Sequence, residues 1–248
     1  QAADQGHEVA MSNLAHIYQH GQGVVQSYVK VREWLERAAA GGCPDAQAVL
    51  GSYYSLGGPE GVTIDLPRAR MWYEKAVAQG HAEAQCCLGG MHHEGKGGPQ
   101  DFTRARELYE LAAAQGHAVA MFNLGVLYEH GQGVAQRYVK ARDWYERAAE
   151  AGNAQTQTAL GCYYHYGREG VAIDLPRARM WYETAAAQGH AGAQNNLGGM
   201  HLQGQGGPQD FTRARELLEL AAAQGQGQSI ISIGVLYGDG QGVKQDLN

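Results

Sequence analysis

The residues best suited to chemistry in this sequence are four cysteines and eleven histidines. Thiolates bind metals, act as nucleophiles or pair as disulfides. Adjacent Cys86 and Cys87 could bind a metal ion together, although a half-buried helix position is the commoner setting for such residues. Cys43 and Cys162 stand alone in the sequence. We therefore predict free thiols, which favours a reducing compartment such as the cytoplasm, although the sequence leaves the localisation unknown.

The histidines offer two candidate metal sites, and both are incomplete. His16 and His20 are four residues apart and could share a metal on one helix face, but no third ligand is near them in the sequence. His92-His93-Glu94 is equally isolated, and His92 is more typical of a buried structural residue. A second group of histidines follows glycine and is expected at helix starts, where the ring can satisfy free N–H groups: His7, His81, His117 and His190.

Known catalytic patterns are also missing from the sequence. There is no Gly-x-Ser-x-Gly elbow, phosphate-binding loop or dinucleotide fingerprint, and the many Gly-x-Gly pairs follow helical patterns rather than strands. The sequence therefore predicts no catalytic residue, no bound metal and no cofactor.

Composition narrows the class of partner. The 248 residues are 44% hydrophobic and 18% charged, with a formal net charge of −6. This lacks the basic character that phosphate backbones require, and no long apolar run suggests a membrane span, so we expect neither nucleic acid binding nor direct membrane insertion. The chain begins at Gln1 and ends inside a sequence pattern that continues elsewhere, so we expect a fragment of a longer protein.

The elements that position these residues follow a repeat that covers the chain. The repeats are predicted at 31–68, 69–104, 105–140, 141–177, 178–213 and 214–248, after a partial repeat at 1–30. A longer period lies on top, because residues 69–104 and 178–213 agree at 28 of 36 positions. Three unlike repeats thus form a cassette that occurs twice.

Each repeat is predicted to be a pair of helices. In the repeat at 141–177, apolar residues at Ala141, Trp144, Tyr145 and Ala148 form one helical stripe, and Gly152 ends that helix. A second helix carries a Leu-Gly pair, Leu160-Gly161, which recurs in the other repeats. A glycine inside a helix costs roughly 1 kcal/mol relative to alanine, so we expect a close approach of the Trp-Tyr helix's backbone, or alternatively of a ligand.

The pattern as a whole resembles the Sel-one-like repeat, a relative of the tetratricopeptide repeat. The resemblance rests on Trp144-Tyr145, Ala148-Ala149, Leu124-Gly125 and Gly131-x-Gly133-Val134, and it covers nearly the whole chain. It implies an all-α fold, a right-handed solenoid of about six helix-turn-helix repeats, and a role as a scaffold or adaptor. One cysteine-rich subgroup binds β-lactams, but its regular cysteine pairs are absent here.

The polar edge of the Trp-Tyr helix repeats most strictly. Counted from the first apolar residue of the stripe, such as Ala141, arginine always occupies the second position and glutamate the sixth. This spacing of four residues predicts a ladder of ion pairs or, alternatively, one charged wall of a binding groove. The arginines are Arg32, Arg70, Arg106, Arg142, Arg179 and Arg215, and the glutamates are Glu36, Glu74, Glu110, Glu146, Glu183 and Glu219.

Four apolar residues interrupt that polar edge: Met71, Leu111, Met180 and Leu220. We expect this edge to line the concave face, as it does in related helical arrays, so these residues are candidate anchors for a partner protein or peptide. The alternative is that they pack against neighbouring helices. The leading hypothesis is a protein-binding scaffold without enzyme activity. The alternatives are an enzyme of the β-lactam-binding kind or a metal hydrolase, and a structural spacer that associates end to end.

Overall fold

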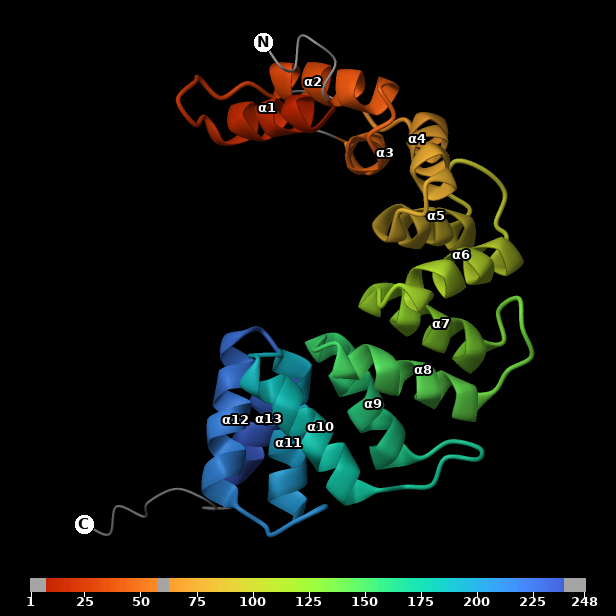
Figure 1. Cartoon of the computed structure of the whole chain (residues 1–248). Coiled ribbons are helices and arrows are strands. Elements are labelled where there is room, and N and C mark those ends of the chain that lie inside the picture. Colours follow the sequence, from red (N-terminus) through yellow and green to blue (C-terminus); the bar gives the residue numbers. More distant parts are fainter. Residues whose placement is uncertain (1–7, 58–62, 239–248) are drawn as a thin grey trace. The chain divides into compact units, whose positions relative to one another are not determined.

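The computed structural model describes residues 8–57 and 63–238, and within these ranges the regular structure consists of thirteen α-helices (Figure 1). The predicted all-α repeat fold is confirmed. The first seven residues of the predicted partial repeat and residues 239–248 of the last one lie outside the described residues. None of the described helices is long and apolar enough to span a membrane.

The chain forms two compact units, and each is described by itself. Unit 1 comprises residues 1–120 and 132–134, and unit 2 comprises residues 121–131 and 135–248. The helices of unit 1 are α1 Glu8–His20, α2 Tyr28–Ala40, α3 Pro44–Leu56, α4 Leu66–Ala78, α5 Ala82–Glu94 and α6 Phe102–Ala114. Helix α7, Ala118–His130, is shared between the units. The helices of unit 2 are α8 Tyr138–Glu150, α9 Ala154–Tyr166, α10 Leu175–Ala187, α11 Ala191–Gln203, α12 Phe211–Ala223 and α13 Gly227–Gly238.

Side chains that cap the first turn set the helix boundaries. The Asp65 and Asp174 side chains accept the backbone N–H groups of Arg68 and Arg177, each at 3.0 Å, which satisfies donors that the first turn leaves free. Asp101 and Asp210 do the same for α6 and α12. The histidines expected at helix starts are caps too, since the Nδ1 atoms of His81, His117 and His190 accept backbone N–H groups. His7 lies outside the described residues.

The Leu-Gly glycines mark the closest contact between neighbouring helices, but the approaching group differs from the one predicted. A Cβ atom on Gly125 would lie 2.4 Å from the ring of Tyr145, and one on Gly161 would lie 2.5 Å from the ring of Tyr182. Tyr73 and Tyr109 press on Gly51 and Gly89 in unit 1 in the same way. The neighbour is therefore the tyrosine ring of the next helix along the chain, not the backbone of the preceding Trp-Tyr helix.

Paired glutamines form a second contact that repeats between helices. The Nε2 atom of Gln79 donates to Oε1 of buried Gln47 at 2.9 Å, and Gln188 donates to Gln157 at 2.7 Å. Gln47 and Gln157 also donate to the carbonyl oxygens of Ala39 and Ala149. The same pairing joins Gln115 to Gln85 and Gln224 to Gln194. Each pair satisfies a buried polar group while it joins two helices.

These contacts surround a separate apolar core in each unit. The core of unit 1 contains Val31, Leu35, Leu50, Trp72 and Leu88, among others. The core of unit 2 contains Tyr145, Leu160, Tyr182, Leu197 and Met200, among others. Because one helix pair buries its apolar stripe only against its neighbours, stability is expected to be shared among adjacent repeats.

Substitution at the Leu-Gly position should reveal the tyrosine contact. Gly125→Ala should lower the free energy of unfolding by about 1–3 kcal/mol, because the new methyl group overlaps the buried ring of Tyr145. The matched control is Gly199→Ala in α11, where a Cβ meets no atom within 4 Å and the better helix former should stabilise by up to about 1 kcal/mol. Chemical denaturation measures both. Equal effects of the two substitutions would show that the ring imposes no constraint.

A double-mutant cycle should detect the glutamine pair. Gln188→Ala leaves the Oε1 atom of buried Gln157 without its donor and should cost about 1–3 kcal/mol of stability. Adding Gln157→Met should recover part of this loss, because it removes the unsatisfied group and creates the Met and Ala combination found at Met121 and Ala151. Additive losses would contradict the coupling.

Candidate interaction surfaces

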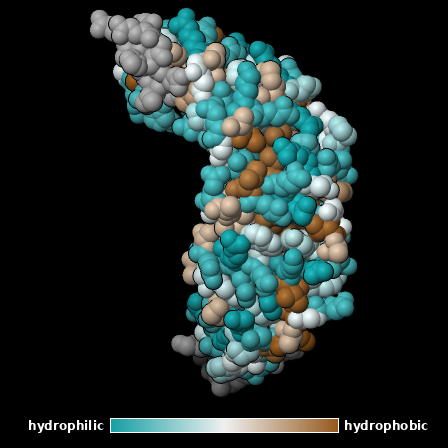
Figure 2. All heavy atoms as spheres, turned by 45° about the vertical axis from the view of Figure 1, so that its right-hand side comes forward, coloured by the Kyte–Doolittle hydropathy of each residue, from teal (hydrophilic) through white to brown (hydrophobic). Residues whose placement is uncertain are grey.

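The four predicted anchor residues all lie on the surface of the described units. Met71 and Leu111 are 40% and 50% exposed in unit 1, and Met180 and Leu220 are 46% and 52% exposed in unit 2. They belong to helices α4, α6, α10 and α12. Figure 2 shows small, separate apolar patches on a face that is otherwise mostly hydrophilic. We call Met71 with Leu111 in unit 1, and Met180 with Leu220 in unit 2, the apolar ridge of each unit; whether a partner contacts them stays a prediction.

The ion-pair ladder beside the ridge forms in four of its six predicted places. Arg70 lies 3.3 Å from Glu74 and Arg179 lies 3.2 Å from Glu183, while the pairs of Arg106 with Glu110 and Arg215 with Glu219 are longer, at 3.7 Å. Exposed pairs of this kind contribute little to stability. These ion pairs therefore stabilise the fold little. Their main effect is to place charged side chains beside the ridge.

The other two glutamates have tyrosine partners instead. Glu146 accepts a hydrogen bond from the hydroxyl group of Tyr164, and Glu36 accepts one from Tyr54 at 3.0 Å. Arg142 pairs with its neighbour Asp143 rather than with Glu146. A tyrosine on the next helix thus competes for the glutamate, which the spacing within one helix does not predict.

Two buried histidines contact arginines of the ion-pair ladder. The guanidinium nitrogen Nη2 of Arg179 lies 3.0 Å from Nδ1 and 3.1 Å from Nε2 of His201, and Arg70 contacts His92 in the same way in unit 1. Burial, followed by the charge of the neighbouring arginine, lowers the pKa of both histidines. Glycine is required beside each guanidinium, because a Cβ on Gly207 would lie 2.3 Å from Nη1 of Arg179. These histidines are structural, as the sequence indicates for His92.

A small hollow lies between α10 and α12 next to His201. Its volume is about 260 Å³, and its lining includes Leu197, Leu217 and Leu220 together with Glu183 and Arg213. Leu220 of the ridge thus borders a hollow of mixed polar and apolar lining with one charged group of each sign. Such a space accommodates a single side chain rather than a whole ligand.

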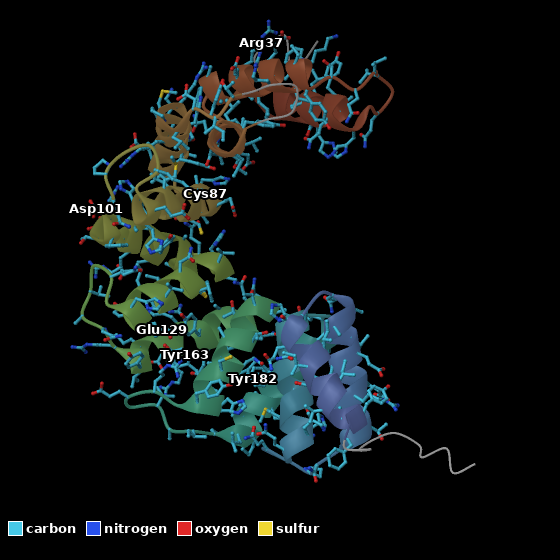
Figure 3. The ribbon with its side chains drawn as sticks, turned by 180° about the vertical axis from the view of Figure 1, so that it is seen from behind. Arg37, Cys87, Asp101, Glu129, Tyr163 and Tyr182 are labelled. Atoms are coloured by element: carbon cyan, nitrogen blue, oxygen red, sulfur yellow. The ribbon has the colours of Figure 1, made fainter. Side chains whose placement is uncertain are left out.

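Sequence reasoning missed a second set of hollows, between the Leu-Gly helices of unit 1. One, of about 170 Å³ between α1 and α3, is lined by Leu35, Asp45 and Val49. The next, of about 300 Å³ between α3 and α5, is lined by residues that include Ser52, Leu56, Tyr73, Glu83, Cys87 and Glu94. Cys87 is labelled in Figure 3. The only signal in the sequence was the difference between the two copies of the cassette, which have Glu83 and Gly192 at equivalent positions.

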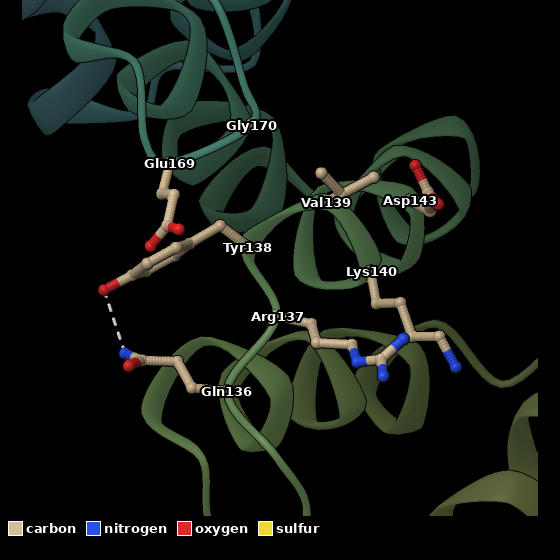
Figure 4. A pocket seen from close by; sticks show the side chains of 8 residues that line it. All are labelled: Gln136, Arg137, Tyr138, Val139, Lys140, Asp143, Glu169 and Gly170. Atoms are coloured by element: carbon tan, nitrogen blue, oxygen red, sulfur yellow. Dashed lines mark hydrogen bonds between the residues drawn. The ribbon is translucent and has the colours of Figure 1, made fainter.

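Another hollow, of about 610 Å³, lies at the start of α8 (Figure 4). Tyr138 and Val139 line it together with Glu169 and Gly170 of the loop after α9. The Tyr138 hydroxyl accepts a hydrogen bond from Gln136. The remaining lining residues are Arg137, Lys140 and Asp143. Charges of both signs surround this hollow in equal number, so its electrostatics select no particular class of ligand.

The described residues contain no cluster that could serve a metal centre: no group of three or more His, Cys, Asp or Glu side chains is placed to bind an ion. None of the four cysteines, all of which lie in the described ranges, forms a disulfide. Burial raises the pKa of the Cys86 thiol to about 12 and that of Cys87 to about 11, which keeps both protonated and weakly nucleophilic at neutral pH. Glu129 and Tyr163 in unit 2 (Figure 3) lie beside Tyr145, whose hydroxyl donates to Glu129. Burial is the largest cause that raises the pKa of Tyr145, so its hydroxyl keeps its proton and this hydrogen bond is structural.

Comparison with known families identifies the repeat. The Sel1 repeat model matches residues 9–43, 44–81, 82–117, 118–153, 154–190, 191–226 and 228–248. The chain belongs to the Sel1 repeat family. The matched Sel1 repeats begin at the Leu-Gly helix and end after the Trp-Tyr helix. The repeats predicted from the sequence begin at the Trp-Tyr helix, so the two sets of boundaries are offset by one helix. The apolar ridge therefore lies on the second helix of the family's repeat. No curated protein matches the chain in sequence.

Solved structures of Sel1 repeat proteins are similar to this chain. A Sel1 repeat protein from Oxalobacter formigenes is 34% identical over 95% of this chain and 67% of its own, with a TM-score of 0.87. A protective antigen of uropathogenic Escherichia coli strains, which displays an SLR fold, is 32% identical over 99% of this chain, with a TM-score of 0.65. This chain spans 60% of that protein's length. An immunity protein from Pseudomonas aeruginosa, 21% identical over 90% of this chain and 83% of its own with a TM-score of 0.54, shares the fold.

The buried histidines should make the Sel1 array less stable in acid. Their folded-state pKa lies below the ordinary value of 6.5, so the unfolded chain binds more protons as pH falls from about 7 toward 5, and the free energy of unfolding decreases over that range. Replacing both (His92→Gln with His201→Gln) should flatten this pH dependence, measured by urea denaturation. Exposed His130→Gln is the control, and an unchanged slope in the double variant would contradict the assignment.

Proposed function

We propose that this Sel1 repeat protein is a protein-binding scaffold and that the apolar ridge is one of its contact surfaces. The observation that carries the proposal is the repetition of the ridge. Met71 and Met180, and likewise Leu111 and Leu220, occupy equivalent positions in the two copies of the cassette and are 40–52% exposed. Exposed apolar groups at matching places in two units do not contribute to either core, so their repetition favours a role outside the fold.

The surroundings of the ridge support contact with protein rather than with a small molecule. Methionine and leucine side chains adapt to differently shaped apolar partners. Arg70 and Arg179 with Glu74 and Glu183 add ordered charges of both signs beside them. Arg106, Arg142, Glu110 and Glu146 are included in the proposed surface as its polar border. Protein binding also agrees with the scaffold role that Sel1 repeat proteins generally have.

Two other hypotheses have less support. The enzyme alternatives need a reactive thiol or a metal site. Burial keeps the Cys86 and Cys87 thiols protonated, and the described residues contain no metal-ligand cluster. End-to-end association stays a prediction; its candidate surface is α13, where Ile230, Ile231 and Val235 are 58–62% exposed. The absence of disulfides among the four described cysteines supports a reducing compartment, as expected from the sequence.

The ridge is tested by changing all four residues together. A chain with Met71→Glu, Leu111→Glu, Met180→Glu and Leu220→Glu should remain folded, because these side chains are about half exposed, and should lose captured partners in a pull-down read by mass spectrometry. The control changes exposed apolar residues elsewhere (Val119→Glu with Ile173→Glu) and should keep the same partners. Partners retained by the ridge variant and confirmed by titration of the purified proteins would exclude the ridge.

A further inference from the structure

The Leu-Gly helices of unit 1 carry a second surface that differs chemically from the apolar ridge. The two neighbouring hollows described above each combine an exposed carboxylate with an exposed apolar side chain. Asp45 and Val49 border the first hollow, and Glu83, Glu94 and Leu56 border the second. Val49 is 42% exposed and Leu56 is 78% exposed. We call these five residues the acidic surface.

Two histidines hold its carboxylates in place without removing their charge. The Nε2 atom of His81 lies 3.0 Å from Asp45, and that of His117 lies 2.8 Å from Glu83. In both rings Nδ1 accepts the backbone N–H that caps the next helix, so this nitrogen carries no proton. Each ring then donates to its carboxylate through Nε2. The hydrogen bond from His117 is the largest cause that lowers the pKa of Glu83, which keeps this carboxylate ionised.

The other contacts within this surface do not cancel its negative charge. Lys96 forms an ion pair with Glu94 and offsets that charge, whereas within residues 8–57 and 63–238 Asp45 and Glu83 pair with histidines and not with lysine or arginine. Their side chains are 82% and 62% exposed. Two oriented, ionised carboxylates therefore face solvent beside apolar hollows.

The second cassette shows that the fold does not need these acids. Gln155, Gly192 and Gln203 of unit 2 stand at the positions of Asp45, Glu83 and Glu94. Helices α9 and α11 nevertheless have the same lengths as α3 and α5, thirteen residues each. The carboxylates are thus a property of one copy only, which separates them from the requirements of the repeat.

We propose that the acidic surface binds a basic, extended segment of a partner protein, with lysine or arginine side chains at Asp45 and Glu83 and large apolar side chains in the hollows. Charge complementarity selects the basic residues. The hollows, about 170 and 300 Å³, each have room for one side chain, and they occur in successive repeats. A segment that crosses the helices and alternates basic with apolar residues fits both features. This proposal is independent of the apolar ridge, which lies on other helices.

The two copies of the cassette supply the variants for the test. The probe is a short fluorescein-labelled peptide that repeats Lys-Leu-Ser, and binding is followed by fluorescence anisotropy at low and high salt. Replacing Asp45→Gln, Glu83→Gly and Glu94→Gln installs the residues of unit 2 and should weaken binding roughly three- to thirtyfold, with loss of the salt dependence. The reverse change (Gln155→Asp, Gly192→Glu and Gln203→Glu) should add binding capacity in unit 2.

Matched controls separate this site from general electrostatic attraction. Glu107→Gln, Glu150→Gln and Glu169→Gln remove three other exposed or half-exposed acids and should leave the affinity unchanged. A peptide that repeats Lys-Ser-Ser should bind more weakly than the leucine peptide, and one that repeats Glu-Leu-Ser should not bind. Equal weakening by the acidic-surface and control variants, or wild-type affinity in both, would overturn the proposal. Because the ridge variant keeps the acidic surface, its binding of the peptide distinguishes failure of this proposal from failure of the ridge.

Discussion

The contact between a tyrosine ring and a helix glycine is the constraint on which the array depends. The ring of Tyr145 occupies the space that a side chain at Gly125 would need, and Tyr182 does the same at Gly161. Leu218 takes this role at Gly198, so a bulky apolar group is required but an aromatic ring is not. The contact brings α3, α5, α7, α9 and α11 close to the following Trp-Tyr helix. Everything on the surface of the helices, including the apolar ridge and the acidic surface, inherits its spacing from this packing.

Polar contacts then fix the register that apolar packing leaves adjustable. A tyrosine ring on a glycine sets how closely two helices approach, while a glutamine pair such as Gln47 with Gln79 also requires two atoms to meet at hydrogen-bonding distance. Breaking one partner leaves a buried polar group unsatisfied, and this penalty explains why the two positions change together. Where Gln157 is replaced by Met121 in another repeat, the partner position has Ala151 in place of Gln188.

Much of this architecture is visible in the sequence because it repeats. Helix starts at Asp65 and Asp174 and the exposure of Met71 and Leu220 follow from periodicity and capping chemistry alone. The sequence did not predict that Glu146 accepts a hydrogen bond from Tyr164 while Arg142 pairs with Asp143, since this choice of partner depends on a neighbouring helix. The acidic surface was missed for the same reason: Asp45 and His81 are distant in the sequence and meet only when adjacent repeats pack together.

The glutamine pairs also divide the array mechanically. Four junctions between consecutive helices have a directional pair, whereas the junction of α1 with α2 has Met11 and Gly41, and that of α7 with α8 has Met121 and Ala151 at the corresponding positions. A methionine tolerates a small sliding movement that would break a hydrogen bond between two amides. Under tension or on binding a large partner, sliding within a repeat should therefore be easier between α1 and α2 and between α7 and α8 than in the four repeats whose two helices share a glutamine pair.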